Sequence, residues 1–156
     1  MATIRAASVA DVPAIEDIIR AAYSVYLPRM GKPPGPMLDD YTARVRAGSV
    51  SVVEDGSTIL GVLVLIPEPD CLLLDNVAVA PEAQGRGLGR RLVEHAEAEA
   101  RRLGVGCLRL YTNVAMVENV TFYAALGFEE THRAEQAGYG RVFMRKRLGD
   151  RLGDER

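Results

Sequence analysis

The sequence is poor in the residues that most often carry redox, metal or nucleophilic chemistry. Among 156 residues there is no tryptophan, and there are two cysteines and two histidines. Cys71 and Cys107 lie in separate apolar stretches without zinc-site spacing, so we expect two buried, reduced thiols rather than a disulfide or a metal site. His95 and His132 are expected at the surface. No spacing suggests a Ser-His-Asp or Cys-His arrangement, and we expect no bound metal.

Long apolar runs and an excess of one charge are missing too. No apolar run approaches the roughly 18 residues of a membrane span, and the N-terminal segment carries acids where an export signal would be apolar. Nineteen basic and 21 acidic residues give a net charge of −2, which argues against a surface that holds duplex nucleic acid. We therefore expect a cytoplasmic protein with no membrane or nucleic-acid partner, either a monomer or a homodimer.

What is present is the composition of an ordinary globular protein, with 48% hydrophobic and 26% charged residues. The length fits one domain, which we place at residues 1–148. Residues 149–156 are expected to form a polar C-terminal tail.

The first third of the chain predicts two helices separated by a proline-rich loop. Ser8 and Asp11 have the spacing of a helix start, and the apolar period after them predicts a helix over residues 9–26. Residues 27–37 contain four prolines and are expected to form a structured loop without a helix. A second, shorter helix is expected over residues 37–47.

The rest of the chain alternates strands and helices. Strands are expected over residues 3–6, 50–54, 57–66, 71–79, 107–112, 128–137 and 141–147, and further helices up to residue 103 and over 115–126. The apolar run at 71–79 is expected to be a central strand buried on both faces. Strands joined by tight turns should be antiparallel, and strands flanking a long helix should be parallel. The predicted fold class is α/β (α+β): a mixed, mostly antiparallel sheet of about seven strands with helices on both faces.

The most informative segment is residues 76–91, NVAVAPEAQGRGLGRR, in which a strand leads into a glycine-rich turn and then a helix. The turn carries Gly85, Gly87 and Gly89 together with Arg86, Arg90 and Arg91. Glycines let the backbone approach a ligand, and the first amides of a helix have no intrahelical partner. The segment therefore suits a phosphate or diphosphate. Its glycine spacing fits neither a dinucleotide fingerprint nor a P-loop, and the alternative is a cluster that only helps strand and helix to pack.

This segment resembles the acyl-CoA-binding segment of the GNAT N-acetyltransferase superfamily. Residues 84–89, QGRGLG, fit its Q/R-x-x-G-x-G/A signature. Residues 108–128, LRLYTNVAMVENVTFYAALGF, resemble the family's strand and the following helix that ends in F/Y-Y-x-x-x-G-F. The resemblance covers nearly the whole chain. It implies the GNAT-like acyl-CoA N-acyltransferase fold, with acetyl-CoA as the co-substrate.

The resemblance also implies roles for individual residues. The backbone amides from Gly85 to Arg90 would hold the CoA diphosphate, and the backbone of Val77 and Val79 would lie beside the pantetheine arm. The Val77 amide is a candidate oxyanion donor. Tyr123 matches the family tyrosine that protonates the departing thiolate, a task that suits a phenol with a pKa near 10. The predicted cofactor-binding residues are Val77, Val79, Gln84, Gly85, Arg86, Gly87, Leu88, Gly89, Arg90, Asn119 and Tyr123.

Two polar residues keep alternative roles. Asn119 lies one helical turn before Tyr123 and is either a pantetheine ligand or a capping amide. The family often has an asparagine seven residues before the tyrosine, where this chain has Met116. Asp75 is the only acid in its strand and shares a face with Val77. It is either the base that deprotonates the acceptor amine or an acid that only shapes the pocket.

The acceptor side is expected near residues 27–41, as in the family. Tyr26 and Tyr41 are candidates to stack on an ammonium group and Asp40 to attract it, although Asp40 fits equally well as an acid at a helix start. The predicted function is transfer of an acetyl group from acetyl-CoA to a primary amine of an unidentified acceptor, by direct attack in a ternary complex. The alternative is a non-catalytic acyl-CoA-binding sensor or interaction domain with the same fold.

Overall fold

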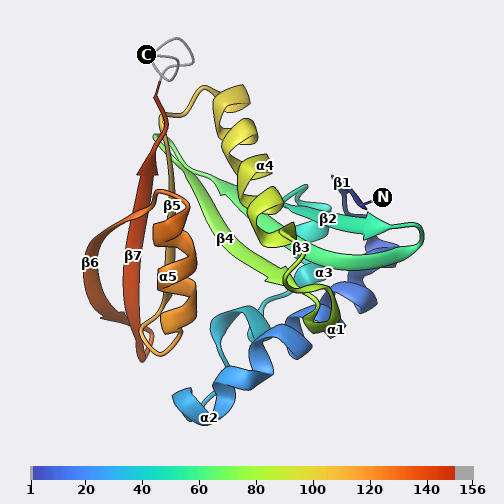
Figure 1. Ribbon diagram of the computed structural model, residues 1–156, viewed down its shortest axis with the longest axis horizontal. Helices are drawn as coiled ribbons and strands as arrows, with labels where there is room; N and C mark the ends of the chain where they lie inside the picture. Colours follow the sequence, from blue (N-terminus) through green and yellow to red (C-terminus); the bar gives the residue numbers. More distant parts are fainter. Residues whose placement is uncertain (1, 150–156) are drawn as a thin grey trace. The chain divides into compact units, whose positions relative to one another are not determined.

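The computed structural model describes residues 2–149 and contains a seven-stranded sheet with the order β1-β2-β3-β4-β5-β7-β6 (Figure 1). The strands are β1 (Ala2–Ala6), β2 (Val50–Asp55), β3 (Thr58–Pro67), β4 (Leu72–Val79), β5 (Cys107–Asn113), β6 (Glu129–Gln136) and β7 (Tyr139–Arg147). The helices are α1 (Val12–Tyr23), α2 (Leu27–Met30), α3 (Tyr41–Arg46), α4 (Leu88–Leu103) and α5 (Val117–Ala125). β4 and β5 pair in parallel, whereas β1–β2, β2–β3, β5–β7 and β6–β7 are antiparallel. The predicted mixed, mostly antiparallel α/β sheet is confirmed.

The described residues form two compact units. The N-terminal unit contains the chain up to Leu65 and residues Asn76–Val93. The C-terminal unit contains residues Ile66–Asp75 and the chain from Glu94 onward. Both β4 and α4 therefore have residues in each unit.

The single domain expected at residues 1–148 stays a prediction. Of the polar tail expected at 149–156, residues 150–156 lie outside the described part of the chain. Within residues 2–149, none of the helices combines the length and the apolarity that crossing a membrane requires.

The start of the helical segment in the N-terminal unit is fixed by a capping interaction. As predicted, Ser8 and Asp11 form this start, because the Asp11 carboxylate accepts from the Ser8 amide (2.7 Å) and hydroxyl (3.2 Å). Hydrogen bonds from the Arg5 guanidinium lower the pKa of Asp11 to about 2. The apolar stripe that follows packs into the core, where Ile15 and Ile19 are completely or almost completely buried.

Residues 9–47 differ from the predicted helices in three ways. The helix expected over 9–26 is α-helical only over α1 and has 3-10 turns at Val9–Asp11 and Ser24–Tyr26. The expectation of no helix in 27–37 is wrong: α2 forms there because Pro28 lies in its first turn, where no backbone donor is needed. The helix expected over 37–47 is confined to α3, since the Asp40 carboxylate accepts from the Ala43 amide (3.1 Å) and sets the start.

A glycine in β3 allows α4 to pack closely against the sheet of the N-terminal unit. A methyl group on Gly61 would lie 2.7 Å from Val53 Cγ1, 3.1 Å from the Ala78 carbonyl oxygen and 3.3 Å from Leu92 Cδ1. We expect Gly61→Ala to lower the free energy of unfolding by about 1–3 kcal/mol, the usual cost of overpacking. Urea unfolding measures this effect, and an unchanged midpoint would contradict the close packing. Gly35→Ala is the matched control, because its added methyl group would meet no atom within 4 Å.

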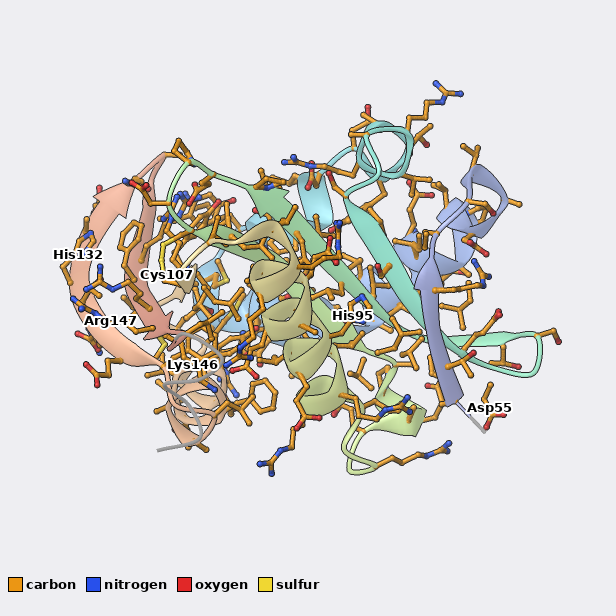
Figure 2. The ribbon with its side chains drawn as sticks, turned by 90° about the horizontal axis from the view of Figure 1, so that it is seen from above. Asp55, His95, Cys107, His132, Lys146 and Arg147 are labelled. Atoms are coloured by element: carbon orange, nitrogen blue, oxygen red, sulfur yellow. A yellow bond between two sulfur atoms is a disulfide. The ribbon has the colours of Figure 1, made fainter. Side chains whose placement is uncertain are left out.

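The C-terminal unit contains the β5-β7-β6 part of the sheet, with α5 against β5 (Figure 1). The expectation of two reduced thiols is wrong, because Cys71 and Cys107 form a disulfide with 4.8 Å between their Cα atoms (Figure 2). The parallel register explains the pairing. Leu72 lies opposite Leu108, so the residues just before them are neighbours although 36 positions separate them in the sequence.

We expect reduction of this disulfide to destabilise the protein. In the chain-entropy description, a loop of this length contributes about 3–4 kcal/mol to the free energy of unfolding. Thermal unfolding with and without a reducing agent measures the effect, and the Cys71→Ala/Cys107→Ala variant should behave like the reduced protein. Two titratable thiols in protein purified without a reducing agent would contradict the disulfide.

Candidate functional site

The glycine turn has the backbone shape that an anion-binding turn needs. Gly85 and Gly87 have φ values of +84° and +78°, in the left-handed region that other residues rarely adopt. The residues from Gln84 to Gly87 are exposed, and a methyl group at either of these glycines would meet no atom within 4 Å. The backbone of the turn is therefore open to a ligand.

The turn leads directly into the N-terminus of α4. The hydrogen bond from the Arg91 amide to the Gly87 carbonyl oxygen (3.1 Å) is the first of the helix, so the amides of Leu88 and Gly89 precede the intrahelical bonds. The first turn of α4 carries no acidic residue, and the positive end of the helix dipole adds to the charge of nearby arginines. The Arg86 guanidinium donates to the Glu82 carbonyl oxygen at 3.2 Å. This arrangement suits a phosphate group.

The second half of β4 is less buried on one face than on the other. The expectation of a strand buried on both faces is therefore wrong for this part. From Asp75 on, burial alternates, so that Asp75, Val77 and Val79 are half-buried whereas Asn76 and Ala78 are buried. The side chains of Asp75, Val77 and Val79 therefore share the less buried face, as the period of two predicts.

The backbone of β4 alternates in the same way. The Ala80 amide donates to the Leu60 carbonyl oxygen of β3 (2.8 Å), so Ala80 directs its backbone groups toward β3. Val77 and Val79 direct theirs to the other edge of the strand. There the Val77 carbonyl oxygen lies 3.4 Å from the Tyr23 hydroxyl, and that of Val79 accepts from Gln84 Nε2 at 3.3 Å. Polar side-chain atoms thus lie against the carbonyl oxygens on this edge.

A buried chain of hydrogen bonds links β4 to the helices of the N-terminal unit. The Tyr23 hydroxyl donates to Asn76 Oδ1 (2.5 Å), Asn76 Nδ2 donates to the Tyr41 hydroxyl (3.0 Å), and the Tyr41 hydroxyl donates to the Pro36 carbonyl oxygen (2.5 Å). Asn76 is 4% exposed. Neither Tyr23 nor Asn76 is predicted from the sequence to have a role. The available signal was a lone amide in an apolar strand.

The candidates on the acceptor side occupy different environments. Tyr41 is 2% exposed, so it contributes a buried hydroxyl rather than an open ring face. Tyr26 is half-buried, and the Arg29 guanidinium lies 5.2 Å from its ring centroid. Asp40 is exposed and caps α3. Acceptor binding by these three residues stays a prediction.

The C-terminal unit holds the other candidates. Tyr123 is 6% exposed, and its ring makes edge contacts with those of Phe122 and Phe128, with centroid distances of 5.1 and 5.6 Å. Asn119 is half-buried, and its Nδ2 donates to the Thr112 hydroxyl at 3.3 Å and contacts Met116 Sδ at 3.5 Å. This leaves the Asn119 Oδ1 atom, an acceptor, for other partners. The roles of Tyr123 and Asn119 stay predictions.

The two histidines lie on different elements, and the Thr131 hydroxyl is 3.0 Å from His132 Nδ1. His132 is exposed on β6 and stacks on Phe143 with 4.3 Å between the ring centroids, and His95 is half-buried on α4 (Figure 2). Within residues 2–149, no three His, Cys, Asp or Glu side chains come together in a way that would hold a metal ion.

A family model described as "Acetyltransferase (GNAT) family" matches residues 12–128. This range contains the glycine turn before α4, and it also contains β5 and α5. The chain belongs to the GNAT acetyltransferase family. The predicted family is thereby confirmed from a match that covers most of the chain.

Curated relatives of this GNAT protein are similar over part of their length. The N-alpha-acetyltransferase 80 of Mus musculus is 42% identical over 65 residues, which are 42% of this chain and 19% of that protein. The ribosomal protein bS18-alanine N-acetyltransferase of Escherichia coli K12 is 40% identical over 57 residues, which are 36% of this chain and 38% of that protein. The chain thus spans well under half the length of these relatives.

Solved GNAT structures share the fold over 95–96% of the chain. The E. coli ribosomal-protein-S18-alanine N-acetyltransferase superposes with a TM-score of 0.77 at 22% identity and covers 96% of both chains. The PaiA N-acetyltransferase of Thermoplasma acidophilum, in complex with coenzyme A, gives a TM-score of 0.77 at 18% identity, over 95% of this chain and 99% of that one. YncA of Salmonella typhimurium, with its cofactor acetyl-CoA, gives a TM-score of 0.73 at 24% identity, over 96% of this chain and 95% of that one.

Proposed function

We propose that this GNAT protein transfers the acetyl group of acetyl-CoA to a primary amine. The observation that carries the proposal is the exposed turn with left-handed Gly85 and Gly87, which opens into the N-terminus of α4. Such a turn suits a diphosphate, the anionic group at the centre of coenzyme A. Membership of the family supports acetyl-CoA as the donor of the transferred group.

Residues of the N-terminal unit bind and orient the donor in this proposal. The amides from Gly85 to Arg90 donate to the diphosphate oxygens, and the arginines of the turn add positive charge. Val77 and Val79 offer their amides to the pantetheine arm. The positions of Tyr23 and Gln84 support this role, because these side chains lie against the Val77 and Val79 carbonyl oxygens on the same edge.

The reaction is a direct attack of the amine nitrogen on the thioester carbon. A carbon–nitrogen bond forms and the carbon–sulfur bond breaks, while the Val77 amide stabilises the negative charge that develops on the carbonyl oxygen. Asp75 takes the proton that the amine loses, directly or through a water molecule. Tyr123 gives its hydroxyl proton to the departing sulfur, and Asn119 Oδ1 accepts from an amide of the pantetheine.

Release of coenzyme A in the presence of amines tests the proposal. Acetyl-CoA is incubated with the protein and a panel of amino acids, polyamines and peptides with free N-termini, and with a metabolite extract. We expect at least one amine to accelerate thiol release and to gain the mass of one acetyl group. Tight binding of coenzyme A without acceleration by any of these amines would contradict the enzyme and favour an acyl-CoA sensor.

A further inference from the structure

The buried chain of hydrogen bonds from Tyr23 through Asn76 to Tyr41 has a direction that the Asn76 amide sets, because it accepts at Oδ1 and donates at Nδ2. We propose that Asn76 is a positioning residue, which ties the segment before α3 to the part of β4 that would polarise the thioester. The inference rests on the proposed function, because it assigns that segment to the acceptor side of the same reaction. Neither Asn76 nor Tyr23 touches the reacting atoms in this account.

Each hydrogen bond in this chain has a defined donor and a defined acceptor. Asn76 Oδ1 accepts from Tyr23, Asn76 Nδ2 donates to the Tyr41 oxygen, and this leaves the Tyr41 proton for the Pro36 carbonyl oxygen. Asn76, Tyr23 and Tyr41 are at most 7% exposed. Water therefore does not readily replace a lost partner, and buried polar groups without partners are costly.

The chain of hydrogen bonds joins segments that are distant in the sequence. Asn76 is 53 residues from Tyr23, at the end of α1, and 35 residues from Tyr41, at the start of α3. Through Tyr41 it also holds the 3-10 turn Gly35–Leu38, which contains Pro36. One strand side chain thereby fixes both ends of the segment between α1 and α3.

The same tyrosine that binds Asn76 also lies against the next residue of β4. The Tyr23 hydroxyl is 2.5 Å from Asn76 Oδ1 and 3.4 Å from the Val77 carbonyl oxygen. The Tyr23 hydroxyl thus lies against the side chain that precedes the Asn76–Val77 peptide and the carbonyl oxygen that follows it, and this peptide carries the Val77 amide. A shift of the segment before α3 would therefore change the position of the proposed oxyanion donor.

Conservative substitutions separate this role from simple packing. Asn76→Asp keeps the size but offers only acceptors when ionised, so Tyr41 would have to turn its proton away from Pro36. Tyr41→Phe keeps the ring and removes one hydroxyl. The matched control is Val45→Ala, which removes buried apolar atoms from α3 without touching the hydrogen bonds.

The test compares these variants with the wild-type protein in kinetics and binding, using the best amine of the panel described above. We expect Asn76→Asp and Tyr41→Phe to lower kcat/KM for the amine about tenfold or more, the effect of one lost buried hydrogen bond. The Kd for coenzyme A should change less than about twofold. Val45→Ala should lower the Tm and leave kcat/KM within about twofold. Equal kcat/KM in all three variants would overturn the proposal.

If no amine is acetylated, the proposed function is wrong, but the role of Asn76 in positioning can still be tested by hydrogen exchange. Exchange of the Val77 amide and of residues 31–40 is followed by mass spectrometry or NMR. We expect Tyr41→Phe to accelerate exchange about tenfold in both places, whereas Val45→Ala should not affect Val77. Unchanged exchange at Val77 in Tyr41→Phe would overturn the coupling.

Discussion

Tyr123→Phe is expected to lower kcat for acetyl transfer by about 100-fold or more, while the Kd for coenzyme A changes less than about twofold. The variant removes one hydroxyl and keeps the ring that contacts Phe122 and Phe128. A general acid contributes about 100-fold to 10,000-fold to a rate, and without it the thiolate must leave unprotonated. Steady-state thiol release and calorimetric titration with coenzyme A measure the two quantities.

The matched control for this variant is Tyr111→Phe in the same unit. Tyr111 is a half-buried tyrosine of β5. The Arg141 guanidinium carbon lies over its ring, 4.3 Å from the ring centroid. Loss of the Tyr111 hydroxyl should leave kcat within about twofold of the wild-type value, because this hydroxyl has no role in the proposed reaction. An unchanged kcat in Tyr123→Phe would remove this tyrosine from the role of acid.

Gly87→Val is expected to raise the Kd for coenzyme A by about 10-fold to 100-fold. At a φ of +78° a side chain costs about 1–2 kcal/mol, and a branched one costs more. The backbone then either keeps the strain or moves the amides that precede the first bond of α4. Each hydrogen bond lost to a charged group would add about 1.5–3 kcal/mol. Titration calorimetry measures the Kd.

Gly56→Val is the matched control for the glycine turn. Gly56 has a φ of +63° in the turn between β2 and β3, and a methyl group there would also meet open space. It should cost similar stability and leave the Kd unchanged. If both variants weakened coenzyme A binding equally, the effect at Gly87 would be one of stability and not of the anion site.

Much of the fold could be read from periodicity. The alternation in residues 50–54 and 57–66 and the glycine and proline turns placed the strands within one or two residues of β2 and β3. The glycine turn before α4 was also readable, because its requirement for left-handed backbone is local. The shape of residues 27–37 was not readable, since prolines exclude a helix interior but not a first turn.

The disulfide and the buried hydrogen bonds could not be predicted from the sequence, because they depend on strand register and on residues far apart in the chain. Cys71 and Cys107 pair only because Leu72 lies opposite Leu108, and no local pattern fixes that register. Asn76 finds partners 53 and 35 residues away, Tyr23 and Tyr41. A buried amide in an apolar strand signals that partners exist, because such groups are almost always hydrogen-bonded, but it does not say which.

The binding of a diphosphate by the turn before α4 is tested most directly by NMR titration of the ¹⁵N-labelled protein. Coenzyme A is compared with pantetheine, which lacks the diphosphate. We predict that coenzyme A shifts the amide resonances of Gly85, Gly87 and Gly89 and leaves that of Gly56 in place, whereas pantetheine shifts none of them. Equal shifts with both ligands, or coenzyme A binding without shifts at these glycines, would contradict the account.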